Sequence, residues 1–263
     1  MSRPFLIDTH CHLDDEAFAA DREEVLARAQ AAGVAVCIVP AVSLENLPAV
    51  VALAERHPGI YAAVGIHPHA AATCTPEGLR RLRAWARHPR VVAIGEIGLD
   101  FYRDLSPREA QQAAFRAQLE LAGELGLPVI LHQRAAASAL LEELERWVAA
   151  RPSARGVLHA FSGDLGIAHT AVAWGFALGI GGPLTYRSAE GLREVVRAVG
   201  LPALVLETDA PYLPPHPHRG RRNEPAYLPL IAETLARLLQ VPEDEVARQT
   251  TENARRLFRL PDR

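Results

Sequence analysis

The sequence predicts a single α/β domain over residues 1–263, folded as a TIM (β/α)8 barrel. Three observations predict it: short apolar runs follow one another, stretches with helical periodicity separate them, and strand starts recur about every 28 residues, the length of a strand–helix unit. The 263 residues suffice for one such barrel, and the 49% of hydrophobic residues can fill a large core. No linker-like composition divides the chain.

The apolar runs are rich in Val, Ile and Leu, and they are continuous rather than alternating, as expected of strands that are covered on both faces. The fifth run carries Pro128 near its start, where a strand tolerates proline best. The eight predicted strands are Phe5–Asp8, Val34–Pro40, Ile60–Ile66, Val91–Ile97, Leu127–Leu131, Gly156–Ala160, Phe176–Ile180 and Ala203–Glu207.

Helical periodicity fills the segments between these runs. The longest such stretch is Glu109–Leu125, and two final helices are expected over residues 225–239 and 243–257, each opened by a proline. His57 and His88 each stand directly before a proline where a helix ends. We therefore expect both histidines to interact with helix dipoles and not to bind metal.

The alternative architecture is an open, doubly wound sheet. Its dinucleotide-binding version needs the pattern G-x-G-x-x-G after the first strand, but this chain has His10-Cys11-His12 there. The stretch Gly179-Ile180-Gly181-Gly182 comes only after the seventh strand and lacks the third glycine. The barrel is therefore the favoured prediction.

Composition excludes several kinds of chemistry. The net charge of −3 gives no global positive field for nucleic acid, and all 28 basic residues are Arg, so neither a Schiff-base lysine nor a carbamylated lysine is available. Three cysteines without C-x-x-C spacing suit a reducing compartment. We find no signal peptide, and glycines and a proline break the longest uncharged run, Leu165–Tyr186. We expect a soluble cytoplasmic protein without membrane contact.

Metal-ligating side chains follow six of the eight runs, at the strand ends where barrel enzymes place their chemistry. Two residues apart on a strand, His10 and His12 face the same side. Glu96 lies inside an apolar run, where a carboxylate is costly unless it is paired or binds metal. The ends of these six runs carry His10 and His12, His67 and His69, Glu96 and Asp100, His132, His159, and Glu207 and Asp209.

Each of these residues also has a structural interpretation when it is taken alone. Glu96 could form a buried ion pair with an arginine, and Asp209 could cap a helix ahead of Pro211. His132 and His159 could be core histidines with hydrogen-bonded rings. Their joint placement at successive strand ends favours metal binding.

The ligand set predicts two divalent ions, because four histidines and two carboxylates exceed the roughly four ligands of one zinc. We assign His10, His12 and Asp209 to the first ion and His132 and His159 to the second. Glu96 is assigned to both, since without lysine the bridge must be a carboxylate. Asp209 is the candidate general base for a metal-activated water. The nitrogen and oxygen ligands suit Zn, Mn or Co, with Mg possible. Cys11 is expected to pack into the barrel wall.

Motifs along almost the whole chain together resemble those of one enzyme family. They are His10-Cys11-His12, Gly65-Ile66-His67-Pro68-His69, the stretch from Gly95 to Arg103, Leu131-His132-Gln133-Arg134, His159-Ala160-Phe161-Ser162-Gly163, the stretch from Leu206 to Leu213, and Arg222-Asn223-Glu224-Pro225. The family is the TatD family of metal-dependent deoxyribonucleases. Ala160 and Ala210 stand where the family often has Cys and Ser, and neither is a predicted ligand.

The resemblance implies a TIM barrel with a divalent-metal centre and hydrolysis of DNA phosphodiester bonds. The expected enzyme is a 3′–5′ exodeoxyribonuclease that acts as a monomer on single strands or frayed ends.

Candidate substrate contacts fall just after strand ends or on late loops. Arginine suits phosphate groups, Ser and Asn can position phosphate oxygens, and an exposed tyrosine can stack on a base. The structural alternatives are surface ion pairs and packing at the barrel rim. The candidates are His67, Tyr102, Arg103, Arg134, Ser162 and Asn223. The basic loop from His216 to Arg222 could meet the phosphate backbone or be a solvated loop.

Two other functions compete with a nuclease. The first is an amidohydrolase-type enzyme acting on a small cyclic amide or lactone, but its usual carbamate bridge requires a lysine. The second is a non-enzymatic metal-binding or scaffold protein, which would not need a complete ligand set with a candidate base.

Overall fold

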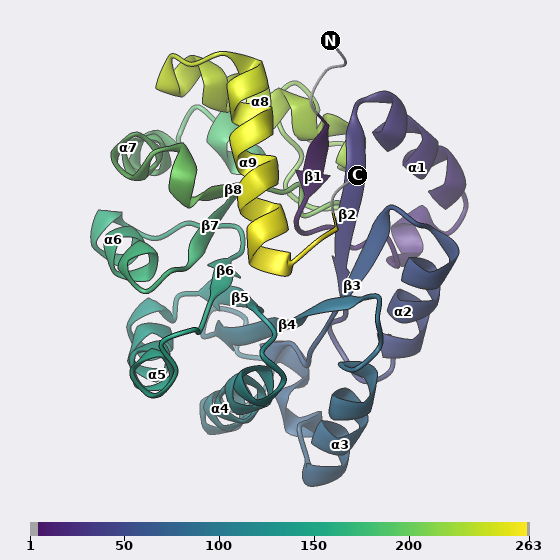
Figure 1. Ribbon diagram of the computed structural model, residues 1–263, viewed down its shortest axis with the longest axis vertical. Helices are drawn as coiled ribbons and strands as arrows, with labels where there is room; N and C mark the ends of the chain where they lie inside the picture. Colours follow the sequence, from purple (N-terminus) through teal and green to yellow (C-terminus); the bar gives the residue numbers. More distant parts are fainter. Residues whose placement is uncertain (1–4, 262–263) are drawn as a thin grey trace. The chain divides into compact units, whose positions relative to one another are not determined.

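The computed structural model describes residues 5–261. Its strands form one parallel sheet in the order β1 to β8 and alternate with helices, which confirms the predicted TIM barrel (Figure 1). The strands are β1 Leu6–Asp8, β2 Val34–Pro40, β3 Ile60–Val64, β4 Val91–Asp100, β5 Val129–Arg134, β6 Gly156–Leu158, β7 Ala177–Ile180 and β8 Leu204–Leu206.

Helices follow the strands along the chain, and short 3-10 helices join several of them. The α-helices are α1 Arg22–Ala31, α2 Leu47–Arg56, α3 Pro76–Trp85, α4 Arg108–Leu125, α5 Ala137–Ala150, α6 Leu165–Ala173, α7 Glu190–Val199, α8 Leu228–Leu239 and α9 Glu243–Phe258. The 3-10 helices are η1 Glu16–Phe18, η2 Pro68–Thr73, η3 Gly182–Thr185, η4 Leu201–Ala203 and η5 Pro225–Tyr227. Among the described residues, no helix has the length and apolar character needed to cross a membrane.

Among the strands only β2 has its predicted bounds; the others differ by one to three residues at one or both ends, and the largest differences lie at the ends of β4 and β5. Strand β4 continues three residues past Ile97, because Gly98, Leu99 and Asp100 pair in register with His132, Gln133 and Arg134 of β5. The helix expected over residues 225–239 begins as η5, and α8 itself starts only at Leu228.

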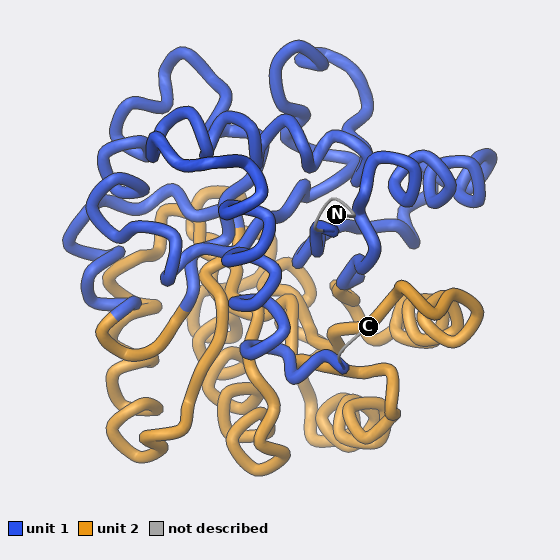
Figure 2. Tube along the Cα trace, turned by 45° about the horizontal axis from the view of Figure 1, so that its top comes forward, with its two compact units in different colours: residues 1–39, 160–172, 177–263 blue, residues 40–159, 173–176 orange. Residues whose placement is uncertain are grey.

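Contacts between Cα atoms divide the chain into two compact units (Figure 2). Unit 1 comprises Met1–Val39, Ala160–Val172 and Ala177–Arg263, and unit 2 comprises Pro40–His159 and Ala173–Phe176. The single domain over residues 1–263 stays a prediction.

Within unit 2, helix α4 lies against β4 and carries two buried glutamines seven residues apart on one face (Figure 1). The Gln118 side chain accepts from the N–H of Ile66 at 2.7 Å and donates to the Ile66 carbonyl at 3.1 Å. Gln111 makes the same pair of bonds with the backbone of Asp100, at 2.9 and 3.2 Å. Helix α4 therefore holds the ends of β3 and β4 by hydrogen bonds as well as by apolar packing.

Gly98 lets β4 approach β5 at its functional end. Its φ is +143°, a value that side chains rarely adopt, and a Cβ atom there would lie 2.0 Å from the His132 carbonyl oxygen. Any larger residue would therefore push β5, and His132 with it, away from β4.

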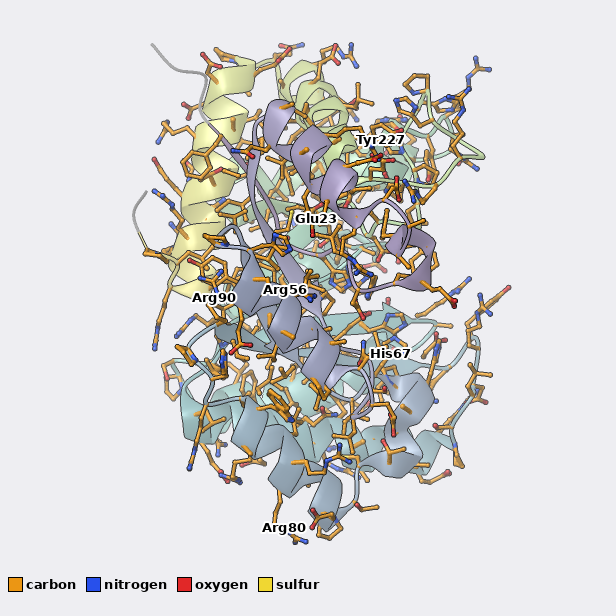
Figure 3. All side chains as sticks on the ribbon, turned by 90° about the vertical axis from the view of Figure 1, so that its right-hand side faces the viewer. Glu23, Arg56, His67, Arg80, Arg90 and Tyr227 are labelled. Carbon is orange, nitrogen blue, oxygen red and sulfur yellow. The ribbon has the colours of Figure 1, made fainter. Side chains whose placement is uncertain are left out.

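Arg90 closes the end of α2 in unit 2 (Figure 3). Its guanidinium donates to the carbonyls of Ala54, His57 and Pro58 at 2.9, 3.1 and 3.0 Å. A cation at this position satisfies terminal carbonyls and complements the helix dipole. His57 is the C-cap residue of α2, which confirms its predicted helix-terminal place, but Arg90 supplies the charge.

Within unit 1, helix α9 covers β1 and β8 (Figure 1). Asn253 donates to the carbonyls of Leu201 and Leu204, both at 2.8 Å, and so ties α9 to the start of β8. Beyond the two strands, Thr9 donates its N–H to Leu206 at 3.0 Å and Asp209 donates to His10 at 2.8 Å. These bonds bring the segments after β1 and β8 together.

Candidate active site

In unit 1, three predicted ligands converge after β1 and β8. Nε2 of His10 lies 3.2 Å from Nε2 of His12. Oδ1 of Asp209 lies 3.8 Å from the first of these nitrogens and 3.5 Å from the second. His10 is fully buried, whereas the side chains of His12 and Asp209 are each 13% exposed. The group therefore opens toward solvent on one side.

A buried carboxylate fixes the backbone around this group. Asp8 accepts from the N–H of His10 at 3.2 Å and from the N–H and hydroxyl of Thr208 at 3.0 and 2.6 Å. Burial raises the pKa of Asp8 to about 7, against the hydrogen bonds from Thr208 and His10 that lower it. Asp8 thus links the chain before His10 to the chain before Asp209.

In unit 2, three imidazoles surround one carboxylate oxygen. Oε1 of Glu96 lies 2.8 Å from Nδ1 of His132, 3.6 Å from Nε2 of His67 and 3.7 Å from Nε2 of His159. Glu96 is 3% exposed, and a carboxylate so deeply buried is costly unless it is paired or binds a metal. His67, shown in Figure 3, lies in a group with Glu96 and His132 that could hold a metal ion, whereas the sequence predicted it as a substrate contact.

Asp100 contacts two histidines, of which His132 belongs to this group and His69 lies beside it. Its Oδ1 accepts from the N–H groups of Tyr102 and Arg103 at 3.0 and 2.8 Å. Its Oδ2 lies 2.8 Å from Nε2 of His69 and 3.3 Å from Nε2 of His132. Although burial acts in the opposite direction, these bonds hold the pKa of Asp100 well below its usual range. Histidines that bind metals are commonly oriented by such a carboxylate on the other ring nitrogen.

The pKa values of His67 and His132 are shifted in opposite directions. Burial lowers the pKa of His67 to about 4, so at neutral pH this ring is neutral and can offer a lone pair. Burial also acts against a charge on His132, but the hydrogen bonds with Asp100 and Glu96 raise the pKa of His132 above its ordinary value. A cation beside Glu96 would displace the proton that these carboxylates otherwise favour on His132.

Both groups fit a divalent cation. Ligand atoms about 2.1 Å from a tetrahedral ion lie roughly 3.4 Å apart. The distances in unit 1 run from 3.2 to 3.8 Å, and those from Glu96 in unit 2 run from 2.8 to 3.7 Å. Imidazole nitrogens mixed with carboxylate oxygens are typical ligands of Zn and Mn.

Two residues of unit 1 that come shortly after strands β6 and β8 have left-handed backbone conformations. These are Ala160 with a φ of 44° and Asp209 with a φ of 57°. Such strain in residues other than glycine is typical of functional sites. The N–H of Ala160 donates to Oε1 of Glu207 at 2.6 Å, so the buried Glu207 connects the turn after β6 to the turn after β8.

Aromatic and basic side chains are exposed near both groups. In unit 2, Tyr102 is 66% exposed and the Arg134 guanidinium lies 4.0 Å above its ring. Arg103 is exposed beside it, and its N–H is fixed by Asp100. In unit 1, Tyr212 is 54% exposed, with its ring centre 6.0 Å from that of His12. Ser162 is exposed on the turn after β6.

Asn223 lies in a different environment from the one expected of a phosphate contact. It is fully buried, and its amide donates to the carbonyls of Thr208 and Tyr212 at 2.8 and 2.6 Å. Its oxygen accepts from the N–H of Glu224 at 2.9 Å. Asn223 therefore stabilises the loop after β8. Because its side chain is buried and hydrogen-bonded within the protein, the proposed substrate contacts do not include it.

Comparison with known proteins identifies the family. The family model for TatD-related DNases matches residues 7–259. The chain belongs to the TatD family. It is therefore a metal-dependent hydrolase.

Individual TatD relatives match this chain from end to end. The metal-dependent hydrolase YabD of Bacillus subtilis is 40% identical over 255 residues, which cover 97% of this chain and 99% of YabD. A 3′–5′ ssDNA/RNA exonuclease, TatD of Erwinia billingiae, is 40% identical over 262 residues, 97% of this chain and 100% of that protein. The crystal structure of YjjV, a TatD homologue from Escherichia coli K12, superposes with a TM-score of 0.92 at 40% identity, covering 99% of this chain and 100% of YjjV.

Four residues of this TatD family member had no assigned role, although local patterns could have indicated them; three are buried, and the side chain of His69 is 33% exposed. Asp100 stands four residues after Glu96, on the same side of β4, and His69 repeats the H-x-H spacing of the first strand. Asp8 and Glu207 each precede a predicted ligand by two residues. For Asp8, Asp100 and Glu207 the signal was the two-residue period of a strand, followed beyond the predicted ligands.

Proposed function

We propose that this chain hydrolyses phosphodiester bonds of DNA and removes nucleotides from the 3′ end of single strands or frayed ends. The observation that carries the proposal is the pair of candidate ligand groups at strand ends, with two histidines around Asp209 and three around Glu96. A TatD relative with 40% identity bears the name 3′–5′ ssDNA/RNA exonuclease, which supports the same substrate class. The acting species is proposed to be a cytoplasmic monomer.

The proposed ligand assignment uses two divalent ions, Zn, Mn or Mg. His10, His12 and Asp209 would hold the first, His132 and His159 the second, and Glu96 both. His67 joins the second set because of its distance to Glu96. When bound, such ions lower the pKa of a water molecule and offset negative charge on phosphoryl oxygens.

The protein side chains have separate roles in this proposal. Asp209, at the solvent-facing side of its group, accepts a proton from the attacking water. Asp100 orients His132 and does not touch substrate. Arg103 and Arg134 offer forked donors to phosphates, and the exposed rings of Tyr102 and Tyr212 offer surfaces on which bases can stack.

A nuclease assay tests the proposal. A single-stranded oligonucleotide labelled at its 5′ end, incubated with Mg, Mn or Zn, should shorten progressively from the 3′ end. EDTA should stop the reaction. Glu96→Gln should lower the rate at least about a hundredfold, because the group in unit 2 loses a charged oxygen. Glu142→Gln, on the exposed surface of α5, is the matched control and should keep full activity.

Two results would contradict the proposal. An active Glu96→Gln enzyme would remove Glu96 from the metal assignment. Failure to shorten any oligonucleotide with all three metals, together with turnover of a lactone or cyclic amide, would favour the amidohydrolase alternative.

A further inference from the structure

A pocket of about 510 Å³ opens in unit 1 beside the turn after β6. Its walls are that turn, η3 and the first turns of α7. Apolar side chains line it together with two serine hydroxyls, one tyrosine and two carboxylates. The residues used below are Phe161, Ser162, Asp164, Tyr186, Ser188 and Glu194. Its volume lies within the range of about 300–1,000 Å³ that is typical of small-ligand sites.

One wall of the pocket is a rigidly held aromatic ring. The Tyr186 hydroxyl donates to the carbonyl of Pro214 at 3.0 Å, and the Arg219 guanidinium lies 4.0 Å above the ring. Arg193 donates to the Tyr186 carbonyl and so fixes its backbone. Phe161, 5% exposed, supplies a second aromatic side chain. A planar ligand can pack on such fixed rings at little cost in conformational entropy.

The pocket is anchored to the turns that carry the candidate active site. Ala160, its first residue, donates to Glu207, and Phe161 donates its N–H to Gly179 of β7 at 3.0 Å. Gly179 has no side chain at the point where a Cβ atom would lie 2.2 Å from Oε2 of Glu207. Asp209 follows Glu207 by two residues, so the bond between Ala160 and Glu207 joins the turn that lines the pocket to the segment that carries the proposed base.

The charges in the pocket discriminate between parts of a nucleotide. Asp164 and Glu194 line the pocket and would repel a phosphate, whereas the Arg219 cation, which lies 4.0 Å above the Tyr186 ring, is not one of the lining residues. Carboxylates instead accept hydrogen bonds from exocyclic amino groups such as N4 of cytosine. The hydroxyls of Ser162 and Ser188 can donate hydrogen bonds to, or accept them from, the remaining polar atoms of a base edge. The lining therefore matches a base with an amino group.

We propose that this pocket receives a base of the substrate strand and selects cytosine, adenine or guanine over thymine or uracil. This inference rests on the proposed nuclease function and assigns it a base preference. Thymine and uracil carry carbonyl oxygens where cytosine carries its amino group, so they would face Asp164 and Glu194 with acceptor against acceptor.

Homopolymers test the preference without knowledge of the register, because every position of such a strand presents the same base to the pocket. Single strands of deoxycytidine and of thymidine, labelled at the 5′ end, are compared by kcat/KM. We expect the ratio to favour deoxycytidine by about tenfold. Asp164→Asn combined with Glu194→Gln should bring the ratio close to one, mainly by faster thymidine turnover.

The two substitutions are chosen to leave the fold intact. Oδ1 of Asp164 accepts the N–H of Ile167 at 2.9 Å and so caps α6, a role that Asn also fills. Glu194 is exposed on α7. Glu233→Gln on α8, which pairs with Arg237 outside the pocket lining, is the control and should keep the wild-type ratio.

The outcomes separate the pocket from the proposed function. Degradation of both homopolymers at equal rates, or a preference that survives the double substitution, would contradict the proposed base selection by the pocket. Neither result would contradict the proposed nuclease activity. If no strand is degraded with any metal, the nuclease proposal fails. Binding of dCMP and dTMP, measured by titration calorimetry, then tests base selection by the pocket independently of catalysis. Tighter binding of dCMP that the double substitution abolishes supports base selection, and equal or absent binding contradicts it.

Discussion

At the scale of single residues, Asp100 is a carboxylate of unit 2 with four hydrogen-bonding partners. It accepts two backbone N–H groups on one oxygen and lies within hydrogen-bond distance of two histidines on the other. Gln111 of α4 holds its backbone on both sides. A carboxylate with so many fixed partners transmits its position to the rings that it touches, and one of those rings is the predicted ligand His132.

Asp100→Asn should weaken metal binding in unit 2 while leaving the fold largely intact. The amide keeps the size of the side chain but loses the charge that fixes the donor on Nε2 of His132, and such losses typically cost about 10- to 100-fold in metal affinity. Competition with a chromophoric chelator measures the affinity directly. Asp104→Asn, an exposed neighbour paired with Arg108, should bind metal like the wild type. Unchanged affinity in Asp100→Asn would show that His132 needs no such partner.

At the scale of elements, four charged side chains of unit 1 join α1 to the loop after β8. Arg222 donates to Asp21 at 2.8 and 2.7 Å and to Glu224 at 3.0 Å, and Arg28 of α1 donates to the same two carboxylates. The bonds with Arg222 hold the pKa of Asp21 down, to about 2. Although burial acts against it, the two arginines also lower the pKa of Glu224. Part of the predicted basic loop therefore serves the fold, since Arg222 is committed to these ion pairs.

This network should make the protein lose stability in acid. Carboxyls with lowered pKa values stabilise the folded state above their ordinary pKa values of 3.8 and 4.5, and the gain disappears as the pH falls toward 2. Glu224→Gln should cost about 2 kcal/mol at pH 7, because Glu224 is 11% exposed and bonded to two arginines. Urea unfolding at several pH values checks both points.

The stability of the Glu224→Gln variant should depend on pH differently from that of the wild type. The difference in unfolding free energy between wild type and Glu224→Gln should shrink below pH 4.5, where Glu224 begins to protonate in the unfolded chain. A constant difference down to pH 2 would mean that the carboxyl contributes packing and not charge.

At the scale of the whole molecule, the candidate ligands belong to both units of the chain. Unit 1 supplies His10, His12 and Asp209, and unit 2 supplies the group around Glu96. A cation that binds only the folded chain stabilises it by mass action, by about 2.7 kcal/mol at one hundred times the dissociation constant.

Removal of metal should therefore lower the thermal stability of the whole protein. We expect the midpoint of unfolding to fall by several degrees in EDTA and to recover when Mn or Zn is restored. Elemental analysis of the reconstituted protein should give about two ions per chain. The variant His12→Ala should lower that number, and an unchanged ion content would remove His12 from the ligand assignment.

Much of this architecture could be predicted because it depends on local periodicity. Continuous apolar runs indicated all eight strands, and the two-residue period of a strand indicated that His10 and His12 share a side. The end of β4 was placed too early, since Gly98 to Asp100 are held in the sheet by pairing with β5 and not by their own apolar character.

The sequence by itself determined the barrel, the family and the residues that stand where strands end, because these follow from patterns read over neighbouring positions. Only the tertiary structure decided which partners those residues have. Asp100 meets His69 across 31 positions, Gln118 meets Ile66 across 52, and Ala160 meets Glu207 across 47. Contacts over such separations depend on how the strands and helices pack, as does the pocket beside Tyr186, and no local pattern specifies them.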